Sequence, residues 1–392
     1  MTYNFDKIVD RNNTGSLKWN WFDDDILPMW VADMDFQSPE PILRALHTHV
    51  EHGVFGYGLP QKKLSETICA RMARLYDWQV TPEEIVFLPG LVSGVNVMCR
   101  AFGEPGSGVL VQTPIYPPFL SAPANHSQIL QTADLATIDQ GETTGYTVDF
   151  DLFERTITKE TRLFLLCHPH NPTGLSYTVD ELTEMAEICA RHDVIICSDE
   201  IHCDLLLDDT IHVPMAAVSP EISQNCITLM APSKTFNIPG LGCSFAIVQN
   251  PELLKRLERA KDGIVPWVNV LGLTAAQAAY DECDSWLAKL CDYLTDNRNF
   301  VIDYIAEEMP ELHPTIPDAT YLSWIYCEEA YIAGNPHKYF LEQAKVALND
   351  GATFGKAGER FVRLNFGCPR SQLKMALDRM KVALDKSLDW KG

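Results

Sequence analysis

Short apolar runs alternate with longer amphipathic stretches through the middle of the chain. Such nearly continuous apolar segments are typical of strands that lie buried on both faces of a parallel sheet. The stretches between them, notably 181–191 and 251–261, are predicted to form helices. Strands and helices in this alternation predict a doubly wound, mostly parallel α/β sheet. The apolar runs occupy residues 85–88, 109–112, 163–167, 194–197, 227–230 and 245–248.

The start of the chain has a different texture. Residues 1–35 are irregular and rich in aromatic side chains, which indicates an arm packed on the rest of the protein. Ser38 and Pro39 then predict the start of a helix, with Ser38 as its N-cap and Gly53 as its terminator.

The last third of the chain predicts a second, smaller unit. A long helical stretch at 273–306 leads to strand candidates at 321–327 and 361–366 and then to a closing helix with an apolar stripe. Fewer strands in this order are typical of a small α+β domain. We expect an N-terminal arm with part of the small domain at 1–50, a large domain at 51–285 and a small C-terminal domain at 286–392.

Composition and charge exclude several classes of protein. Of the 392 residues, 46% are hydrophobic and 21% charged, as in an ordinary globular protein. The 53 acidic residues outnumber the 31 basic ones, and the net charge of −22 disfavours binding to nucleic acid or to an anionic membrane. The chain starts without a signal-like pattern, and no apolar run approaches the ~20 residues of a membrane span. We therefore expect a cytoplasmic protein whose 12 cysteines, none in a Cys-x-x-Cys pair, are reduced.

Lys234 is a lone cation directly after the apolar run 226–230. Ser233 supplies a hydroxyl beside it, and two prolines with a glycine hold the backbone of the stretch 231–241. A Schiff-base lysine is presented to pyridoxal phosphate in this way. Taken alone, the stretch is equally consistent with a turn that carries an exposed lysine. The other strand ends decide, because ligands of doubly wound folds bind there.

Asp199 stands at the end of the apolar run 194–197, in Ser-Asp-Glu-Ile-His. An acid at this place would keep the pyridine nitrogen of the cofactor protonated, so that the ring accepts electrons released at the substrate α-carbon. A helix cap is the alternative role for Asp199. His202 lies three residues on and is expected near the ring, where it would orient Asp199 or the ring oxygen, unless it is a structural histidine.

Asn171 follows the apolar run 163–167 in a turn with two prolines and a glycine. Held in that turn, its amide can donate to the ring hydroxyl oxygen of the cofactor, although Asn-Pro turns are also common without such a role. His168 and His170 lie two residues apart, but no acidic or thiol partner stands at ligand spacing. We therefore predict no metal site.

A phosphate cradle is predicted after the apolar run 85–88. The glycine-rich stretch 89–94 leads into a helix, and free backbone N–H groups at a helix start bind phosphate. The motif is neither a Walker loop nor a dinucleotide fingerprint. The N–H groups would come from Leu91, Val92 and Ser93, and the Ser233 hydroxyl would close the cradle.

Two further side chains complete the candidate site. Tyr116 follows the apolar run 109–112 in a prolyl turn and could stack on the pyridine face. Arg363 lies inside the apolar element 361–366, where a charge needs an anionic partner. A guanidinium suits the α-carboxylate of an amino-acid substrate, with a structural salt bridge as the alternative.

With these residues placed, the chain resembles class I and II PLP-dependent aminotransferases of fold type I over essentially its whole length. Asn171-Pro172-Thr173-Gly174, Asp199, Ser233-Lys234 and Arg363 occur in the order of that family. The amino-acid sequences of residues 29–36, 198–202 and 233–240 resemble those of one branch of this family, the MalY/PatB type of cystathionine β-lyase or C–S lyase.

The resemblance implies more than the residues alone. It implies a homodimer with shared active sites, in which Tyr57 reaches the phosphate of the neighbouring subunit's cofactor. It also implies that Lys234, Asp199 and Tyr116 take part in catalysis and that Ala32 and Asn171 bind substrate beside Arg363. Two positions depart from relatives: Gly242 stands where many aminotransferases have a phosphate-binding arginine, and Pro117 stands where some C–S lyases have a second tyrosine.

The expected reaction is β-elimination from L-cystathionine or a related L-cysteine S-conjugate, giving a thiol, pyruvate and ammonia. An aminotransferase of class I or II is the alternative, because both reactions begin by removal of the α-proton. A PLP protein with a regulatory protein-interaction role is a further reading. Its partner would be a protein and not nucleic acid, given the net charge of −22.

Overall fold

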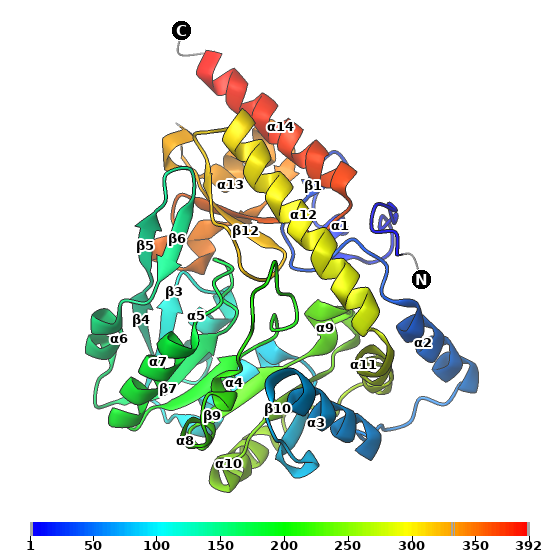
Figure 1. The fold of residues 1–392 in the computed structure, drawn as a ribbon, viewed down its shortest axis with the longest axis vertical. Helices are drawn as coiled ribbons and strands as arrows, with labels where there is room; N and C mark the ends of the chain where they lie inside the picture. The colour runs from blue at the N-terminus through cyan, green and yellow to red at the C-terminus, as the bar shows by residue number, and fades with distance from the viewer. Residues whose placement is uncertain (1–2, 331, 333, 390–392) are drawn as a thin grey trace.

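The large sheet dominates the structure, a computed structural model that describes residues 3–330, 332 and 334–389 (Figure 1). It has seven strands in the order β2-β10-β9-β8-β7-β3-β4. Only β10 runs antiparallel to its neighbours in this sheet. Every predicted strand is present, and the doubly wound α/β class is confirmed. The strands are β2 (Ile85–Leu88), β3 (Gly108–Thr113), β4 (Ile129–Asp134), β7 (Thr161–Cys167), β8 (Ile195–Asp199), β9 (Cys226–Met230) and β10 (Ser244–Ile247).

One strand of this sheet, β4, is not predicted by the sequence pattern. It pairs with β3 at the sheet edge, and only Ala133 in it is buried. Ile129 and Leu130 remain exposed, so the strand lacks the continuous apolar run that marks its buried neighbours.

Helices cover both faces of the large sheet. Successive strand residues alternate between two cores, so that Val109 and Val111 belong to one and Leu110 to the other. The first core also includes residues of α4 (Leu91–Phe102), α5 (Pro117–Asn125) and α10 (Pro251–Lys261). The second core includes residues of α3 (Lys62–Tyr76), α6 (Phe150–Thr156) and α7 (Val179–Arg191) and continues into the C-terminal part of the chain, for example at Trp324 and Leu364.

The long helical stretch expected at 273–306 is two helices. α11 (Val270–Glu282) ends at Cys283, whose dihedral angles of φ −109° and ψ 9° leave the helical range, and α12 (Asp284–Glu308) starts in a new direction (Figure 1). The interruption has no glycine or proline to announce it. The expected domain boundary at 285 falls inside α12, and the division into 1–50, 51–285 and 286–392 stays a prediction.

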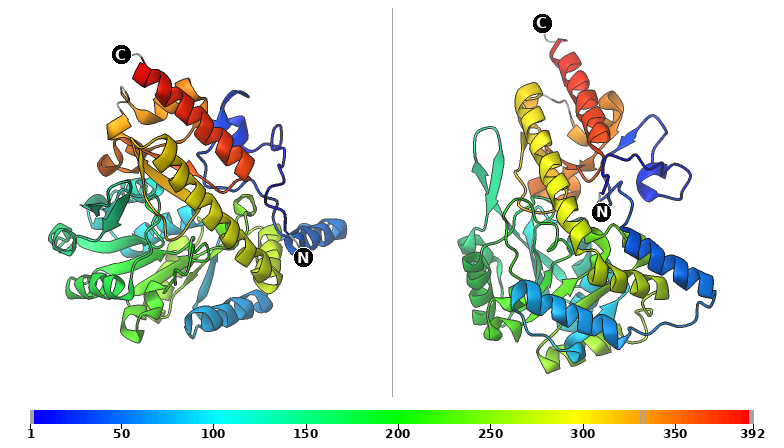
Figure 2. Two further views of the ribbon diagram at one scale, coloured as in Figure 1. Left: turned by 45° about the horizontal axis from the view of Figure 1, so that its top comes forward. Right: turned by 45° about the vertical axis from the view of Figure 1, so that its right-hand side comes forward.

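A second sheet lies beside the first, under α12 and α14 (Arg370–Asp389) (Figure 2). Its strand order is β11-β12-β15-β14, all antiparallel. No helix in the described part of the chain is both long and apolar enough to cross a membrane. The strands are β11 (His313–Pro314), β12 (Leu322–Tyr326), β14 (Asn349–Asp350) and β15 (Phe361–Asn365); α13 (Pro336–Tyr339) and β13 (Val346–Ala347) lie between β12 and β14 in sequence.

The N-terminal arm is tied into the region of the second sheet. After α1 (Leu17–Asn20), β1 (Leu27–Pro28) pairs in parallel with β13. The predicted N-cap of the next helix is wrong. Helix α2 (Glu40–His52) has Pro39 at the cap position, because the Ser38 hydroxyl instead donates to the Asn237 carbonyl oxygen at 3.1 Å. The remaining elements are the hairpin β5 (Ala136–Asp139) and β6 (Thr144–Thr147) and the short helices α8 (Pro220–Ser223) and α9 (Pro232–Thr235).

Candidate active site

Asn171, Asp199 and Lys234 lie together at the carboxyl end of the large sheet, because the parallel strands that precede them all end there. Cys167 of β7 pairs with Asp199 of β8, and Asp199 pairs with Leu229 of β9. The turn after β3 joins the same edge, since the Tyr116 backbone N–H donates to the Asn171 carbonyl oxygen at 3.1 Å. Residues from separate strands thus meet at the carboxyl end of the sheet, as the topology requires.

Lys234 is the cation at the centre of this edge. It lies on α9, and its Nζ donates to the Ala32 carbonyl oxygen at 2.6 Å. Burial lowers its pKa to about 8, opposed by the negative charges of Asp33 and Asp199 and reinforced by Arg363. A lysine with a pKa near neutrality is able to act as a neutral nucleophile and base.

Ala32 contributes its carbonyl oxygen, which accepts a second hydrogen bond from the Tyr321 hydroxyl at 2.9 Å. Tyr321 is fully buried, and its ring centroid lies 6.1 Å from that of His202. The sequence pattern does not mark Tyr321 as a site residue, because an aromatic residue at the start of an apolar strand gives no polar signal. The structure thus adds Tyr321 to the surroundings of Lys234.

Asp199 is a buried acid without an ionic partner in the described part of the chain. Its Oδ1 accepts the backbone N–H of Ile201 at 3.1 Å. Burial raises its pKa to about 7, although that hydrogen bond and the charge of Lys234 oppose the shift. Burial also lowers the pKa of His202 to about 3, so that this ring is neutral, and its Nδ1 is buried with no hydrogen-bond partner among the described residues.

Arg363 is a buried cation that also has no ion pair among the described residues. Its Nη1 donates to Asn171 Oδ1 at 2.8 Å, and its Nη2 donates to the Trp30 carbonyl oxygen at 3.1 Å and to Asn349 Oδ1 at 2.5 Å. Burial lowers its pKa to about 10. A guanidinium surrounded only by neutral oxygens has its charge available for an anionic ligand.

The start of α4 has the form of an anion site. Gly90 is its N-cap, and the first intrahelical bond runs from Gly94 N–H to the Gly90 carbonyl oxygen at 3.0 Å. The N–H groups of Leu91, Val92 and Ser93 precede that bond and have no partner within the helix. Val92 and Ser93 are exposed, and the Ser233 hydroxyl makes no hydrogen bond to the described residues.

The glycine at position 242 fits its backbone. Gly242 has φ +59°, and a Cβ there would lie 3.0 Å from the Pro89 carbonyl oxygen. An arginine at this position would be strained, so a phosphate at the start of α4 has no cation from this position.

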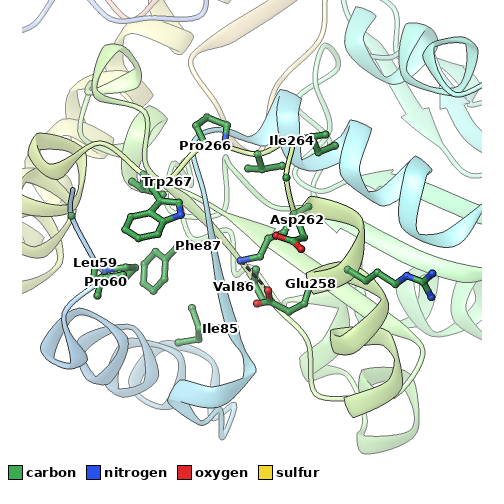
Figure 3. A pocket seen from close by; sticks show the side chains of 16 residues that line it. Leu59, Pro60, Ile85, Val86, Phe87, Glu258, Asp262, Ile264, Pro266 and Trp267 are labelled. Atoms are coloured by element: carbon green, nitrogen blue, oxygen red, sulfur yellow. Dashed lines mark ion pairs between the residues drawn. The ribbon is translucent and has the colours of Figure 1, made fainter. Parts of the chain in front are cut away.

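Tyr57 is not brought to the site within one chain. It is 95% exposed, and its ring stacks edge-on against Trp267 at 5.6 Å between centroids. Trp267 lines a groove of about 1120 Å³ beside the edge strand β2 (Figure 3), whereas Tyr57 lines a neighbouring cavity of about 520 Å³. Apolar side chains line much of the groove, and a Glu258–Lys261 ion pair of 3.1 Å lies at its rim.

The clustered residues fit pyridoxal phosphate. Two charged groups support the fit: Asp199 is a buried acid without an ion pair among the described residues, and Lys234 is an amine with a pKa of about 8. Two polar groups add to it: the unpartnered Nδ1 of His202 and the free N–H groups at the start of α4. Each of these groups lacks the kind of partner that the ring nitrogen, the aldehyde or the phosphate would provide. Tyr116 is half-buried beside Asn171 and borders the same space.

Comparison with known proteins gives a consistent result. The profile of a protein family described as "Aminotransferase class I and II" matches residues 25–380. The chain is 37% identical to "Cystathionine beta-lyase PatB" of Bacillus subtilis (strain 168), over 97% of this chain and 100% of that protein. It is 35% identical to "Protein MalY" of Escherichia coli (strain K12), over 95% of this chain and 96% of that protein. The solved structure of cystalysin from Treponema denticola, which contains pyridoxal 5'-phosphate, has a TM-score of 0.93 and 31% identity and covers 98% of this chain and 100% of its own.

Proposed function

The chain belongs to the family of class I and II aminotransferases, and within this family we propose that it is a PLP-dependent carbon–sulfur lyase of the cystathionine β-lyase type. The relative of Bacillus subtilis carries that name, and cystalysin contains the cofactor. One observation carries the proposal in this chain: Lys234, with a pKa of about 8, stands among an unpaired acid and an unpaired guanidinium. The substrate is a small molecule, an amino acid.

Each part of the cofactor would contact a different group of residues in the site. When bound, pyridoxal phosphate accepts the electron pair that is released at the substrate α-carbon. Asp199 would accept a hydrogen bond from the protonated ring nitrogen, and this contact keeps the acid ionised although burial raises its pKa to about 7. The other groups would hold the aldehyde (Lys234), the ring hydroxyl (Asn171), the ring face (Tyr116) and the phosphate (Leu91, Val92, Ser93, Ser233). His202 would lie near the ring and orient Asp199 or the ring oxygen.

The substrate would be oriented and deprotonated by three groups of this chain. Arg363 binds the α-carboxylate, and its contacts with Asn171 and Trp30 set its direction. With a pKa of about 8, the Lys234 amine is partly neutral near pH 8 and is able to take the α-proton. The Ala32 carbonyl, 2.6 Å away, then holds the ammonium that results.

Elimination is favoured over transamination when the β-carbon bears sulfur. A thiolate whose conjugate acid has a pKa near ~8.5 leaves more readily than hydride or carbon. Breaking the bond from the β-carbon to sulfur releases the thiol, and water converts the three-carbon remainder into pyruvate and ammonia. Cystathionine would therefore yield homocysteine, pyruvate and ammonia.

A product assay tests the reaction type. The purified holoenzyme is given L-cystathionine with and without 2-oxoglutarate, and pyruvate, ammonia, homocysteine and glutamate are measured. We expect pyruvate at the same rate in both conditions and no glutamate. Turnover that requires 2-oxoglutarate, with glutamate formed and no pyruvate from any β-thio substrate, would replace the lyase by an aminotransferase.

We further propose that the active form is a homodimer in which Tyr57 serves the neighbouring subunit. Support comes from the groove in Figure 3, which is lined by several apolar side chains that are exposed in the single chain: Leu59, Ile264, Pro266 and Trp267. Tyr57 is 95% exposed, and its ring contacts Trp267 of this patch at 5.6 Å between centroids. A second copy seated there would cover the patch and leave Tyr57 pointing away from its own chain.

Mixed dimers test this arrangement. Tyr57→Ala and Lys234→Ala each damage one partner of a shared site, so a heterodimer of the two variants has one intact site. We expect each variant alone to be inactive or weakly active and the co-expressed mixture to regain activity. Trp267→Glu should weaken the dimer, as measured by light scattering. Ile211 is also apolar and is 79% exposed elsewhere on the surface, and Ile211→Glu should leave the dimer unchanged. A monomeric active enzyme would contradict the proposal.

We also propose a cytoplasmic location. All 12 cysteines are unpaired, and most are buried. A reducing compartment keeps such thiols free, whereas an oxidising one would favour disulfides. Cell fractionation with an antibody against the chain decides the point.

A further inference from the structure

We propose that Asn349 is a positioning residue that aims the Arg363 guanidinium at the carboxylate of the substrate, and that its amide keeps the charge of Arg363 unpaired. The inference rests on the proposed role of Arg363 as carboxylate anchor. It names what decides the strength of that anchor.

The two residues face each other across the small sheet. Asn349 of β14 lies directly opposite Arg363 of β15 in an antiparallel pair, so their side chains are neighbours on one face. Arg363 Nη2 donates to Asn349 Oδ1 at 2.5 Å. This is the only side-chain hydrogen bond of Asn349 among the described residues. Its side chain therefore serves Arg363 and contributes nothing to strand pairing.

Asn349 is itself held in place by the segment that follows it. The Asp350 carboxylate accepts from the Ala352 backbone N–H at 3.1 Å and from Asn335 Nδ2 at 3.0 and 3.1 Å. Farther on, Phe354 accepts the Ile115 N–H on its carbonyl oxygen at 2.8 Å. The segment is thus anchored on both domains, and the Asn349 amide has a fixed position.

The Phe354 ring completes the support of the guanidinium. The Arg363 guanidinium carbon lies 5.0 Å from the centroid of that ring, and a cation over an aromatic face is stabilised without being neutralised. Within the described residues, every hydrogen bond of the guanidinium goes to a neutral oxygen, of Asn171, Trp30 or Asn349. Arg363 is therefore oriented from several sides while no carboxylate cancels its charge.

The identity of residue 349 matters for this reason. An aspartate would have nearly the same shape and the same acceptor oxygen, but it would form a buried ion pair with Arg363. A substrate carboxylate would then have to compete with an internal one. An amide at this position supplies direction and leaves the ionic interaction to the ligand.

Two probes that differ only at the carboxylate test the inference on the holoenzyme. L-Alanine and L-alaninamide have no leaving group on the β-carbon, so their binding is read from the visible absorption of the bound cofactor without elimination. The variants are Asn349→Asp, Asn349→Ala and, as a control that adds a carboxylate to the exposed part of the same segment, Ala352→Asp.

We expect the affinity for L-alanine to fall about a hundredfold in Asn349→Asp and about tenfold in Asn349→Ala. These are the changes typical of an ion pair or a hydrogen bond at a charged group. L-Alaninamide should change by less than about threefold in both, because it makes no ionic contact with Arg363. The Ala352→Asp variant should bind both probes like the unmodified enzyme. With cystathionine, KM should rise in the same order while kcat changes little.

Two results would overturn the inference: unchanged L-alanine affinity in Asn349→Asp, or equal weakening of both probes in the Asn349 variants. If Asn349→Asp fails to bind the cofactor, Asn349→Ala decides by the same ratio. Failure of the proposed reaction is a separate result, because it appears as absence of pyruvate from cystathionine in the unmodified enzyme, whereas the probes need no turnover.

Discussion

Buried charges occur in two neighbouring regions of this protein, and the two regions treat them in opposite ways. In the N-terminal arm, Lys18 is fully buried and pairs with Asp35 at 2.7 Å. Arg11 pairs with Asp35 at 2.6 Å and with Asp33 at 2.8 Å. Burial by itself would raise the pKa of Asp35, yet its cationic partners outweigh it and hold the pKa below its usual range.

The active-site charges have no such partners. Burial moves the pKa values of Asp199, Lys234 and Arg363 toward neutrality, to about 7, 8 and 10. None of the three forms an ion pair within the described residues. Paired charges build a fixed scaffold, whereas unpaired ones store free energy that a charged ligand releases on binding.

The two regions meet in the segment 29–36. Its carbonyl oxygens at Trp30 and Ala32 accept from Arg363 and Lys234, while Asp33 and Asp35 bind the arm. The paired cluster thus holds the backbone that the unpaired charges use. Removing a charge should therefore have different consequences on the two sides.

The largest expected effect is the loss of Lys234. Lys234→Ala removes both the amine that would hold the cofactor and the base, so pyruvate formation should fall by at least about a thousandfold. The purified variant should also lack the visible absorption of the holoenzyme. A coloured variant with substantial turnover would show that this lysine is wrongly assigned.

Breaking the paired cluster should act on stability. Asp35→Ala removes the 2.7 Å partner of buried Lys18 and leaves only the Asp33 carboxylate, at 3.8 Å, so it should cost about 3–5 kcal/mol in the free energy of unfolding, measured by urea titration. Glu40→Ala, which breaks an exposed ion pair with Arg44, is the control and should cost less than about 1 kcal/mol. Because the pKa of Asp35 is lowered, its contribution is present at neutral pH and is lost as the pH falls through that lowered value.

Removing an unpaired charge should have the opposite sign. In the cofactor-free protein burial raises the pKa of Asp199 to about 7 from its ordinary value of 3.8, so the folded state binds more protons between these values and loses stability as the pH rises through them. Asp199→Asn should therefore raise the stability of the cofactor-free protein at pH ~8 by roughly 2–4 kcal/mol and leave it unchanged near pH ~4. The same variant should lose most of its activity. If Asp199→Asn and the unmodified protein have equal thermal midpoints at both pH values, burial does not destabilise the Asp199 carboxylate.

The smallest of these effects concerns Arg363. Arg363→Ala removes a charged hydrogen bond to the substrate, which is worth about 1.5–3 kcal/mol of binding free energy. KM should therefore rise roughly ten- to a hundredfold. The cofactor-free protein should lose less stability than in Asp35→Ala, since hydrogen bonds to neutral oxygens are lost but no ion pair is broken. Steady-state kinetics with cystathionine and a urea titration measure the two quantities. A stability loss as large as that of Asp35→Ala would show that Arg363 is structural.

Several features of the fold could not be predicted because their signals are not local. Strand β4 is an exposed edge and lacks an apolar run, and the break between α11 and α12 falls at Cys283 without glycine or proline. Ser38 has the side chain of an N-cap, but a carbonyl nearly 200 residues away takes its hydroxyl. In each case a tertiary contact or exposure overrides the local pattern.

By itself, the sequence determined the fold class and the residues gathered at the sheet edge. Buried parallel strands need continuous apolar runs, and their carboxyl ends must lie together, so Asn171, Asp199 and Lys234 were marked by where their strands stop. Only the tertiary structure decided which of these groups have partners. Tyr321 and Ala32 meet across 289 residues, and Asn349 faces Arg363 from a two-residue strand. Burial, and with it the pKa of each charge, depends on such packed neighbours, which no local pattern along the chain contains.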